Sequence, residues 1–148
     1  FIKTYSEHLK KEEREDALNY NLAELNYEQK NYDDAMSFLN RAMTAKDIYY
    51  KLSSRIILLK IYFELQEEEP LFSLLASFKL FLRRNTEVSK TVIDTYFNFC
   101  NLLTKIARKN EEKSTKLKEE IKQITPLTDR NWLLEAYETT YESGKLFA

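Results

Sequence analysis

Glycine, proline, cysteine and histidine are nearly missing from this chain of 148 residues, which contains one glycine, two prolines, one cysteine and one histidine. Tight hairpin turns and phosphate-binding loops depend on glycine, so its scarcity favours long helices joined by short turns. A single cysteine excludes an internal disulfide and a cysteine-rich zinc site. Lys60 interrupts the most apolar stretch, IILLKIYFEL, and we therefore expect no membrane insertion. The sequence predicts an all-α fold.

The charges are close to balanced, with a formal net charge of −1, and 43% of the residues are hydrophobic. This balance gives no overall attraction to nucleic acid or to anionic lipid, and the hydrophobic content is sufficient for a packed core. The chain begins at Phe1 rather than at a methionine and carries no signal-peptide pattern. We therefore expect a cytoplasmic fragment of a longer protein.

Apolar residues recur with helical spacing along the whole chain, and this periodicity predicts about eight antiparallel helices. The first helix would end near residue 10, and a separate second helix would begin near Glu12 and bury Leu18, Leu22 and Leu25. A last helix would begin near Asp129 and end at Gly144. The intervening helices are expected over residues 32–45, 48–65, 71–84, 88–108 and 110–124.

The sequence contains few residues in arrangements that are typical of catalytic sites. His8 has no second histidine with which to share a metal or to complete a nucleophile–base pair, and Cys100 lies on a mostly apolar helix. Carboxylate pairs such as Glu12 and Glu13 fall at expected helix ends, where solvent keeps them from acid–base work. We expect a non-enzymatic protein with no catalytic residue, no cofactor and no metal.

A basic region occupies the C-terminal half of the chain. Its members are Arg83, Arg84, Lys105, Arg108, Lys109, Lys113, Lys116, Lys118 and Lys122. Glutamates are interleaved with these cations, and Glu112 and Lys116 have the spacing of a surface ion pair on a helix. A solvated helix face is the favoured interpretation, so we expect no nucleic-acid binding, and a helical nucleic-acid binder is kept only as a minor alternative.

The segment NLAELNYEQKNYDDAMSFLNRA, residues 21–42, places small residues at regular intervals between bulky ones. The positions concerned are Leu22, Ala23, Tyr32, Asp33, Asp34, Ala35, Leu39 and Ala42. Small side chains let two helices approach closely, while the larger ones fill the space beside them. Over residues 17–43 this pattern resembles a tetratricopeptide repeat. The resemblance implies a right-handed α–α superhelix, a solenoid of paired helices.

The same resemblance implies one TPR-like helical domain over residues 1–148. Within it, residues 1–10 would be the remnant of an upstream hairpin, 11–46 a repeat unit, 47–85 a degenerate unit, 86–125 a helical pair and 126–148 a capping helix. Leu59, Leu71 and Phe78 depart from the pattern, because small residues are expected at those positions. The stretch LLKIYFELQEEEPLFSLLASFKLFLRRN is also similar to the C-terminal parts of long bacterial repeat proteins, especially from the Bacteroidetes.

In tetratricopeptide arrays the first helix of each hairpin lines a concave groove that holds a partner. The resemblance transfers this role to Tyr20, Asn21, Glu24, Tyr27 and Glu28 in the first unit, and to Ser53, Ile57, Lys60, Phe63 and Glu64 in the second. Asn21 matches a position that holds a peptide carboxylate in some members, but the companion cations are missing, so that mode is not expected. The sequence favours a protein-interaction scaffold for an extended or helical segment of a protein partner. A purely structural capping arm is the alternative.

Overall fold

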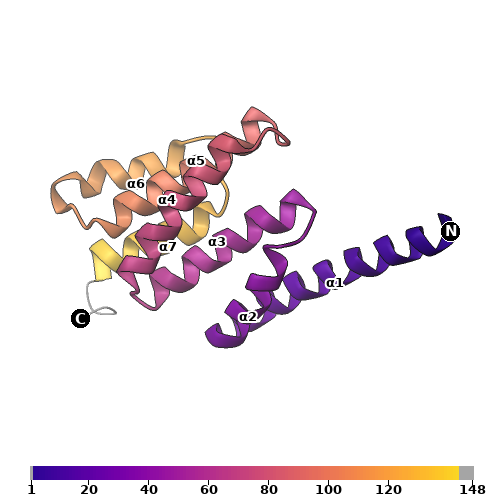
Figure 1. The fold of residues 1–148 in the computed structure, drawn as a ribbon. Helices are drawn as coiled ribbons and strands as arrows, with labels where there is room; N and C mark the ends of the chain where they lie inside the picture. Colours follow the sequence, from indigo (N-terminus) through magenta and orange to yellow (C-terminus); the bar gives the residue numbers. More distant parts are fainter. Residues whose placement is uncertain (1, 144–148) are drawn as a thin grey trace. The chain divides into compact units, whose positions relative to one another are not determined.

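The computed structural model describes residues 2–143, with side chains from Lys10 to Glu142, and this part of the chain is helical without a β-strand (Figure 1). The all-α prediction is confirmed. Seven α-helices occur in the described range: α1 (Ile2–Glu28), α2 (Tyr32–Ala42), α3 (Ile48–Glu64), α4 (Glu68–Arg84), α5 (Lys90–Ala107), α6 (Ser114–Gln123) and α7 (Arg130–Tyr137). A 3-10 turn, η1 (Glu111–Lys113), precedes α6, and a π-helical segment, η2 (Glu138–Ser143), follows α7. The expected end of the last helix at Gly144 lies outside the described residues.

The chain divides into two compact units, one ending at Glu67 and the other beginning at Glu68. Helices α1 to α3 form the first unit, and α4 to α7 form the second. The division falls inside the segment 47–85 that the sequence pattern assigned to a single repeat. None of the helices in the described part is both long and apolar enough to cross a membrane.

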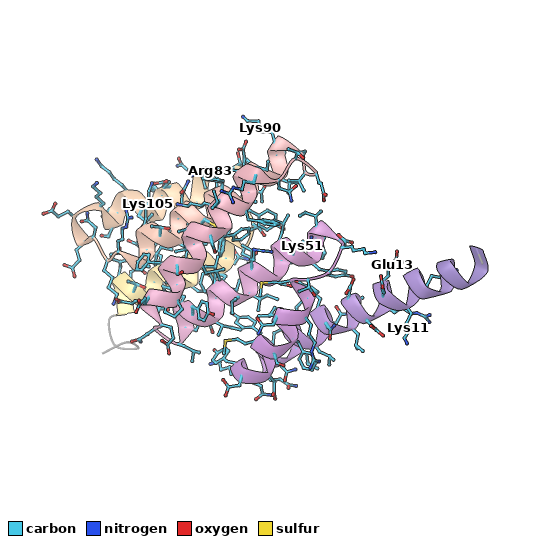
Figure 2. All side chains as sticks on the ribbon, in the orientation of Figure 1. Lys11, Glu13, Lys51, Arg83, Lys90 and Lys105 are labelled. Atoms are coloured by element: carbon cyan, nitrogen blue, oxygen red, sulfur yellow. The ribbon has the colours of Figure 1, made fainter. Side chains whose placement is uncertain are left out.

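Helix α1 is one continuous helix where the sequence predicted two. No glycine or proline occurs between residues 2 and 28, and charged side chains such as Lys11 and Glu13 extend into solvent, so nothing breaks the helix near Glu12 (Figure 2). The predicted inward stripe is also wrong. Leu18 is 57% exposed and Leu25 is 50% exposed, whereas the buried side of α1 carries Tyr20 and Ala23.

Small residues occupy the helix contacts of the first unit. Helix α2 packs mainly against α1 and also against α3. Ala35, Leu39 and Ala42 lie on one side of α2 and are fully buried, as is Ala23 of α1. Because an alanine projects only one methyl group, the helix backbones can approach closely at these positions. The small residues of the segment 21–42 therefore lie at helix contacts, whereas Phe38 on the same helix is only half-buried.

The second unit has a core of apolar residues contributed by all four of its helices. Helix α4 packs on α5, and α5, α6 and α7 pack on one another. Its buried residues are Leu71, Leu75, Phe78, Leu82, Phe99, Cys100, Leu102, Leu103, Ile106, Leu117, Ile121, Leu133, Ala136 and Tyr137. The Ser89 hydroxyl caps α5 by accepting from the Val92 amide at 3.3 Å. Asp129 stands at the N-cap position of α7 without forming a side-chain cap bond.

Helix ends without glycine give a first testable prediction. Lys30, Gln66 and Lys109 follow α1, α3 and α5 in the left-handed conformation, with φ of 62°, 58° and 54°. A Cβ atom is strained there and glycine is not, so each replacement by glycine should raise the free energy of unfolding by about 0.5–1 kcal/mol. Denaturant titration measures the change. As a matched control, Ser37→Gly inside α2 should lower stability by about 0.5–1 kcal/mol; a loss at all three helix ends as well would contradict the prediction.

Candidate functional site

Helices α1 and α3 lie side by side and run in the same direction. Asp16 of α1 lines a hollow with Tyr50 of α3, and further along the Tyr20 ring contacts that of Tyr50. The Lys60 ammonium of α3 then lies over the ring of Tyr27, 5.9 Å from its centroid. Residue numbers rise together on the two helices. These contacts define a surface that we call the α1–α3 face. It is formed by Glu12, Asp16, Tyr20, Glu24 and Tyr27 of α1, by Asp47 at the N-cap of α3, and by Tyr49, Tyr50, Ser53, Lys60 and Glu64 of α3.

Three tyrosines pack together in the middle of the α1–α3 face. The ring of Tyr20 lies 5.9 Å from that of Tyr49 and 5.4 Å from that of Tyr50, and the last two are 5.6 Å apart. Edge-on and tilted arrangements at these separations are favourable for aromatic rings. Burial, followed by the hydrogen bond to Glu24, raises the pKa of Tyr20. Tyr49 is 55% exposed and extends this cluster to the surface.

One carboxylate joins all three helices of the first unit. Glu64, at the end of α3, accepts hydrogen bonds from the hydroxyls of Tyr27 on α1 and Tyr32 on α2, the latter at 2.9 Å. The two tyrosine rings are 6.2 Å apart. Burial, and then the bond to Glu64, raises the pKa of Tyr32 to about 12. This cluster fixes the position of the tyrosines at the far end of the face.

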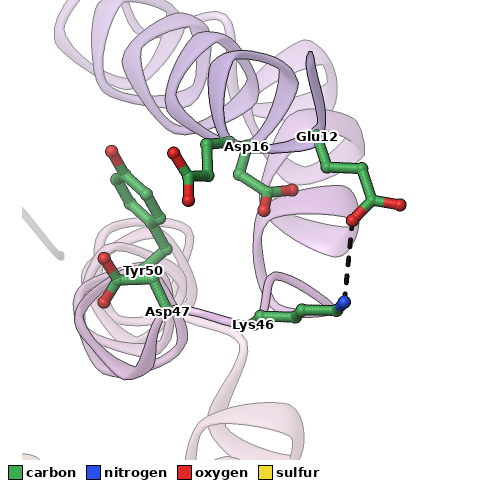
Figure 3. Close-up of a pocket in the computed structure, with 6 residues that line it drawn as sticks. Glu12, Asp16, Lys46, Asp47 and Tyr50 are labelled. Atoms are coloured by element: carbon green, nitrogen blue, oxygen red, sulfur yellow. Dashed lines mark ion pairs between the residues drawn. The ribbon is translucent and has the colours of Figure 1, made fainter. Parts of the chain in front are cut away.

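The opposite end of the face is acidic and hollowed (Figure 3). An open hollow of about 480 Å³ is lined by Glu12, Glu13, Asp16, Lys46, Asp47 and Tyr50. Lys46 forms an ion pair with Glu12 at 3.7 Å, which leaves an excess of carboxylates. Burial and the neighbouring carboxylates, those of Glu12 and Glu15 foremost, raise the pKa of Asp16. The electrostatic potential in the hollow therefore favours a positively charged group.

The ten residues predicted to line the groove differ in their exposure. Tyr20, Ser53 and Ile57 are buried. The half-buried residues are Tyr27, Lys60, Phe63 and Glu64, and the exposed ones are Asn21, Glu24 and Glu28. The structure brings Tyr27, Lys60 and Glu64 into one cluster and Tyr20, Glu24 and Ser53 into another. Their role in binding stays a prediction.

Several residues of the face were missed in the sequence. Tyr49 and Tyr50 lie in the first turn of α3, where the N-cap residue Asp47 accepts a 2.8 Å hydrogen bond from the Tyr49 amide. Tyr32 was identified only as a space-filling residue of the repeat pattern. The pair of tyrosines in IYYK, next to an N-cap, was the one signal that the sequence offered for these residues.

The other candidates for chemistry in the sequence are Cys100 and His8. Cys100 of α5 is fully buried, and burial raises the pKa of its thiol to about 12, which keeps it protonated and unreactive at neutral pH. Within the described residues no group of histidine, cysteine and carboxylate side chains is arranged to hold a metal ion. The side chain of His8 lies outside the described side chains.

Comparisons with family models, with curated proteins and with solved structures found no match. A functional proposal for this chain therefore rests on the geometry of the α1–α3 face.

The raised pKa of Tyr32 leads to a prediction of how the stability of the chain depends on pH. The pKa of Tyr32 is raised from about 10 to about 12 in the folded chain, so folding favours the protonated phenol. Its contribution to stability is complete below the unfolded pKa and is lost as the pH rises from about 10 to about 12. The melting temperature should fall over this range, and Tyr32→Phe should make the fall shallower. An unchanged pH slope in the variant would show that the Tyr32 hydroxyl does not titrate in this way.

Proposed function

We propose that this chain is a non-enzymatic protein-interaction module that holds a segment of another protein along the α1–α3 face. The observation that supports this proposal is the parallel pairing of α1 and α3 with Tyr27, Lys60 and Glu64 at one end and the acidic hollow at the other. In a tetratricopeptide array the first helices of successive hairpins are likewise parallel and line the binding surface. The proposal therefore includes a repeat-like role for α1 to α3.

The buried alanines are consistent with that family resemblance. Ala23, Ala35 and Ala42 occupy the small-residue positions of the repeat pattern, and all three are fully buried in the first unit. Their small size lets α2 pack close to α1 and α3. Helix α1 also contacts α3 directly. Sequence pattern and packing thus agree in the first hairpin, and we propose that it is a tetratricopeptide-like unit.

The chemistry of the face indicates what kind of segment would fit. The exposed ring of Tyr49 and the half-buried rings of Tyr27 and Tyr50 offer apolar area, which favours one or two apolar anchors in the partner. Glu24 and the acidic hollow favour a basic residue near one end of the segment. We propose an extended or helical partner segment with a few aromatic or aliphatic anchors and at least one lysine or arginine.

Peptide selection tests the proposed function while the partner is unidentified. Short random peptides on phage are selected against the chain, and the strongest binder is measured by calorimetry. The double variant Glu24→Ala, Lys60→Ala should weaken that peptide by at least about tenfold, because both side chains flank the aromatic part of the face. Since Glu24 is exposed and Lys60 is half-buried, the melting temperature should change little.

Leu18→Ala provides the matched control, because Leu18 is exposed on the other side of α1 and should leave affinity unchanged. Amide chemical shifts locate the bound peptide independently of the variants. Selected peptides that shift only amides of α4 to α7, or that bind the double variant as tightly as the original chain, would refute binding at this face. Repeated failure to select any peptide would favour the structural capping arm.

A further inference from the structure

The cations of the second unit are not all neutralised. Lys118 pairs with Glu142 at 2.7 Å, Lys122 with Glu119 at 3.8 Å, and Lys109 with Glu68 at 4.0 Å. Each of these carboxylates therefore balances one cation. Other cations of this unit lie outside these pairs.

Arg108, Lys113 and Lys116 have no ion-pair partner among the described residues. The spacing of Glu112 and Lys116 predicted a surface pair, but the two residues form no ion pair in the described part of the chain. Glu112 belongs to the 3-10 turn η1 rather than to α6, so the helical spacing that would join them is not realised. Lys116 therefore keeps a charge that the sequence pattern had assigned to an ion pair.

All three of these cations line one hollow. It has a volume of about 380 Å³ and is formed where the end of α5, the turn η1 and the beginning of α6 meet, with η2 beside them. Its lining residues are Lys105, Arg108, Asn110, Lys113, Lys116, Leu117, Glu120 and Tyr141. Its one carboxylate, Glu120, accepts two bonds from the ammonium of Lys105, at 2.8 and 3.1 Å (Lys105 is labelled in Figure 2).

The remaining groups shape the hollow. The Tyr141 hydroxyl contacts the carbonyls of Lys105 and Ile106 at 3.3 and 3.4 Å, and the Tyr141 ring stacks on that of Tyr137 at 5.0 Å. Leu117 is buried and supplies an apolar patch to the lining. The first turn of α6 also points its backbone amides toward this end of the helix, which adds a positive partial charge.

We propose that this hollow binds a compact ligand carrying two or more phosphate groups. Three cations that are not neutralised and come from different elements can each reach a separate phosphate oxygen, and Arg108 can offer two parallel donors. The volume falls in the range of small-molecule sites. A long nucleic acid is disfavoured, because the whole chain has a net charge of −1 and the cations converge on a hollow instead of following an extended stripe.

Calorimetry with inorganic triphosphate tests the proposal on the intact chain. Saturable binding is expected, and it should weaken as salt is added. The double variant Lys113→Ala, Lys116→Ala should weaken it by at least about tenfold, and Arg108→Ala by a similar factor, because each change removes a direct phosphate contact. Circular dichroism should show the same helix content in both variants, since all three side chains are exposed.

The control removes one positive charge elsewhere on the same unit. Arg84→Ala on α4 should leave the affinity for triphosphate unchanged, because Arg84 is exposed and does not line the hollow. Phosphatidylcholine vesicles with and without a bisphosphorylated phosphatidylinositol then distinguish a lipid headgroup from a free ligand. The proposal is overturned if triphosphate gives no saturable heat, or if Arg84→Ala weakens binding as much as the double variant Lys113→Ala, Lys116→Ala. It is also overturned if triphosphate binds outside the hollow, at sites from which a single-stranded RNA displaces it.

Discussion

Replacing Phe78 by alanine should lower the free energy of unfolding of the second unit by about 3–5 kcal/mol relative to the original chain. Phe78 of α4 is fully buried, and its ring lies 6.1 Å from that of Tyr96 on α5. The substitution removes an aromatic side chain from the contact of α4 with α5 and leaves a cavity that the helices can close only in part. Urea titration followed by circular dichroism measures the loss.

Leu80→Ala is the control for Phe78, because Leu80 lies on the same helix and is 42% exposed. Its effect should stay within about 1 kcal/mol, since surface positions contribute little to stability. If the two variants lost the same stability, Phe78 would not be a central core residue and the packing of α4 on α5 would need revision.

Enlarging Ala35 to leucine should destabilise the first unit by about 1–3 kcal/mol. Ala35 is fully buried on α2, and the added isobutyl group must push α2 away from its neighbours or adopt a strained rotamer. Only a small side chain fits at this position, and this is the physical reason for the alanine in the repeat pattern. Thermal denaturation and denaturant titration both report the change.

Ser37→Leu makes the matched change on the exposed side of α2. It should alter stability by no more than about 0.5 kcal/mol, because the new side chain remains in solvent. Equal stability of Ala35→Leu and the original chain would mean that α2 does not pack closely at Ala35.

Much of the fold follows from one-dimensional patterns. The scarcity of glycine and proline predicted helices throughout, and the apolar spacing located several of them, such as residues 71–84 against the observed α4. The prediction was wrong at α1, where Leu18 and Leu25 are exposed. A long amphipathic helix offers more than one apolar stripe, and the neighbours that choose among them are distant in the sequence.

The candidate sites were less accessible to sequence reasoning. Groove positions could be named by analogy, but the convergence of Tyr27 and Tyr32 on Glu64 joins residues 32 to 37 positions apart in the chain. The basic hollow was hidden for a related reason. Spacing alone matched Lys116 with Glu112, whereas Lys118 of α6 pairs with Glu142 of η2, which lies 24 positions away in the chain.

Because α1 and α3 are parallel, the surface between them has a polarity. One end is rich in carboxylates, and the other carries the balanced charges of Lys60 and Glu64. A captured segment would then bind in a single orientation, with its cationic terminus at the carboxylate-rich end. A synthetic peptide of the same composition in reversed order would place that cation at the wrong end and should compete poorly.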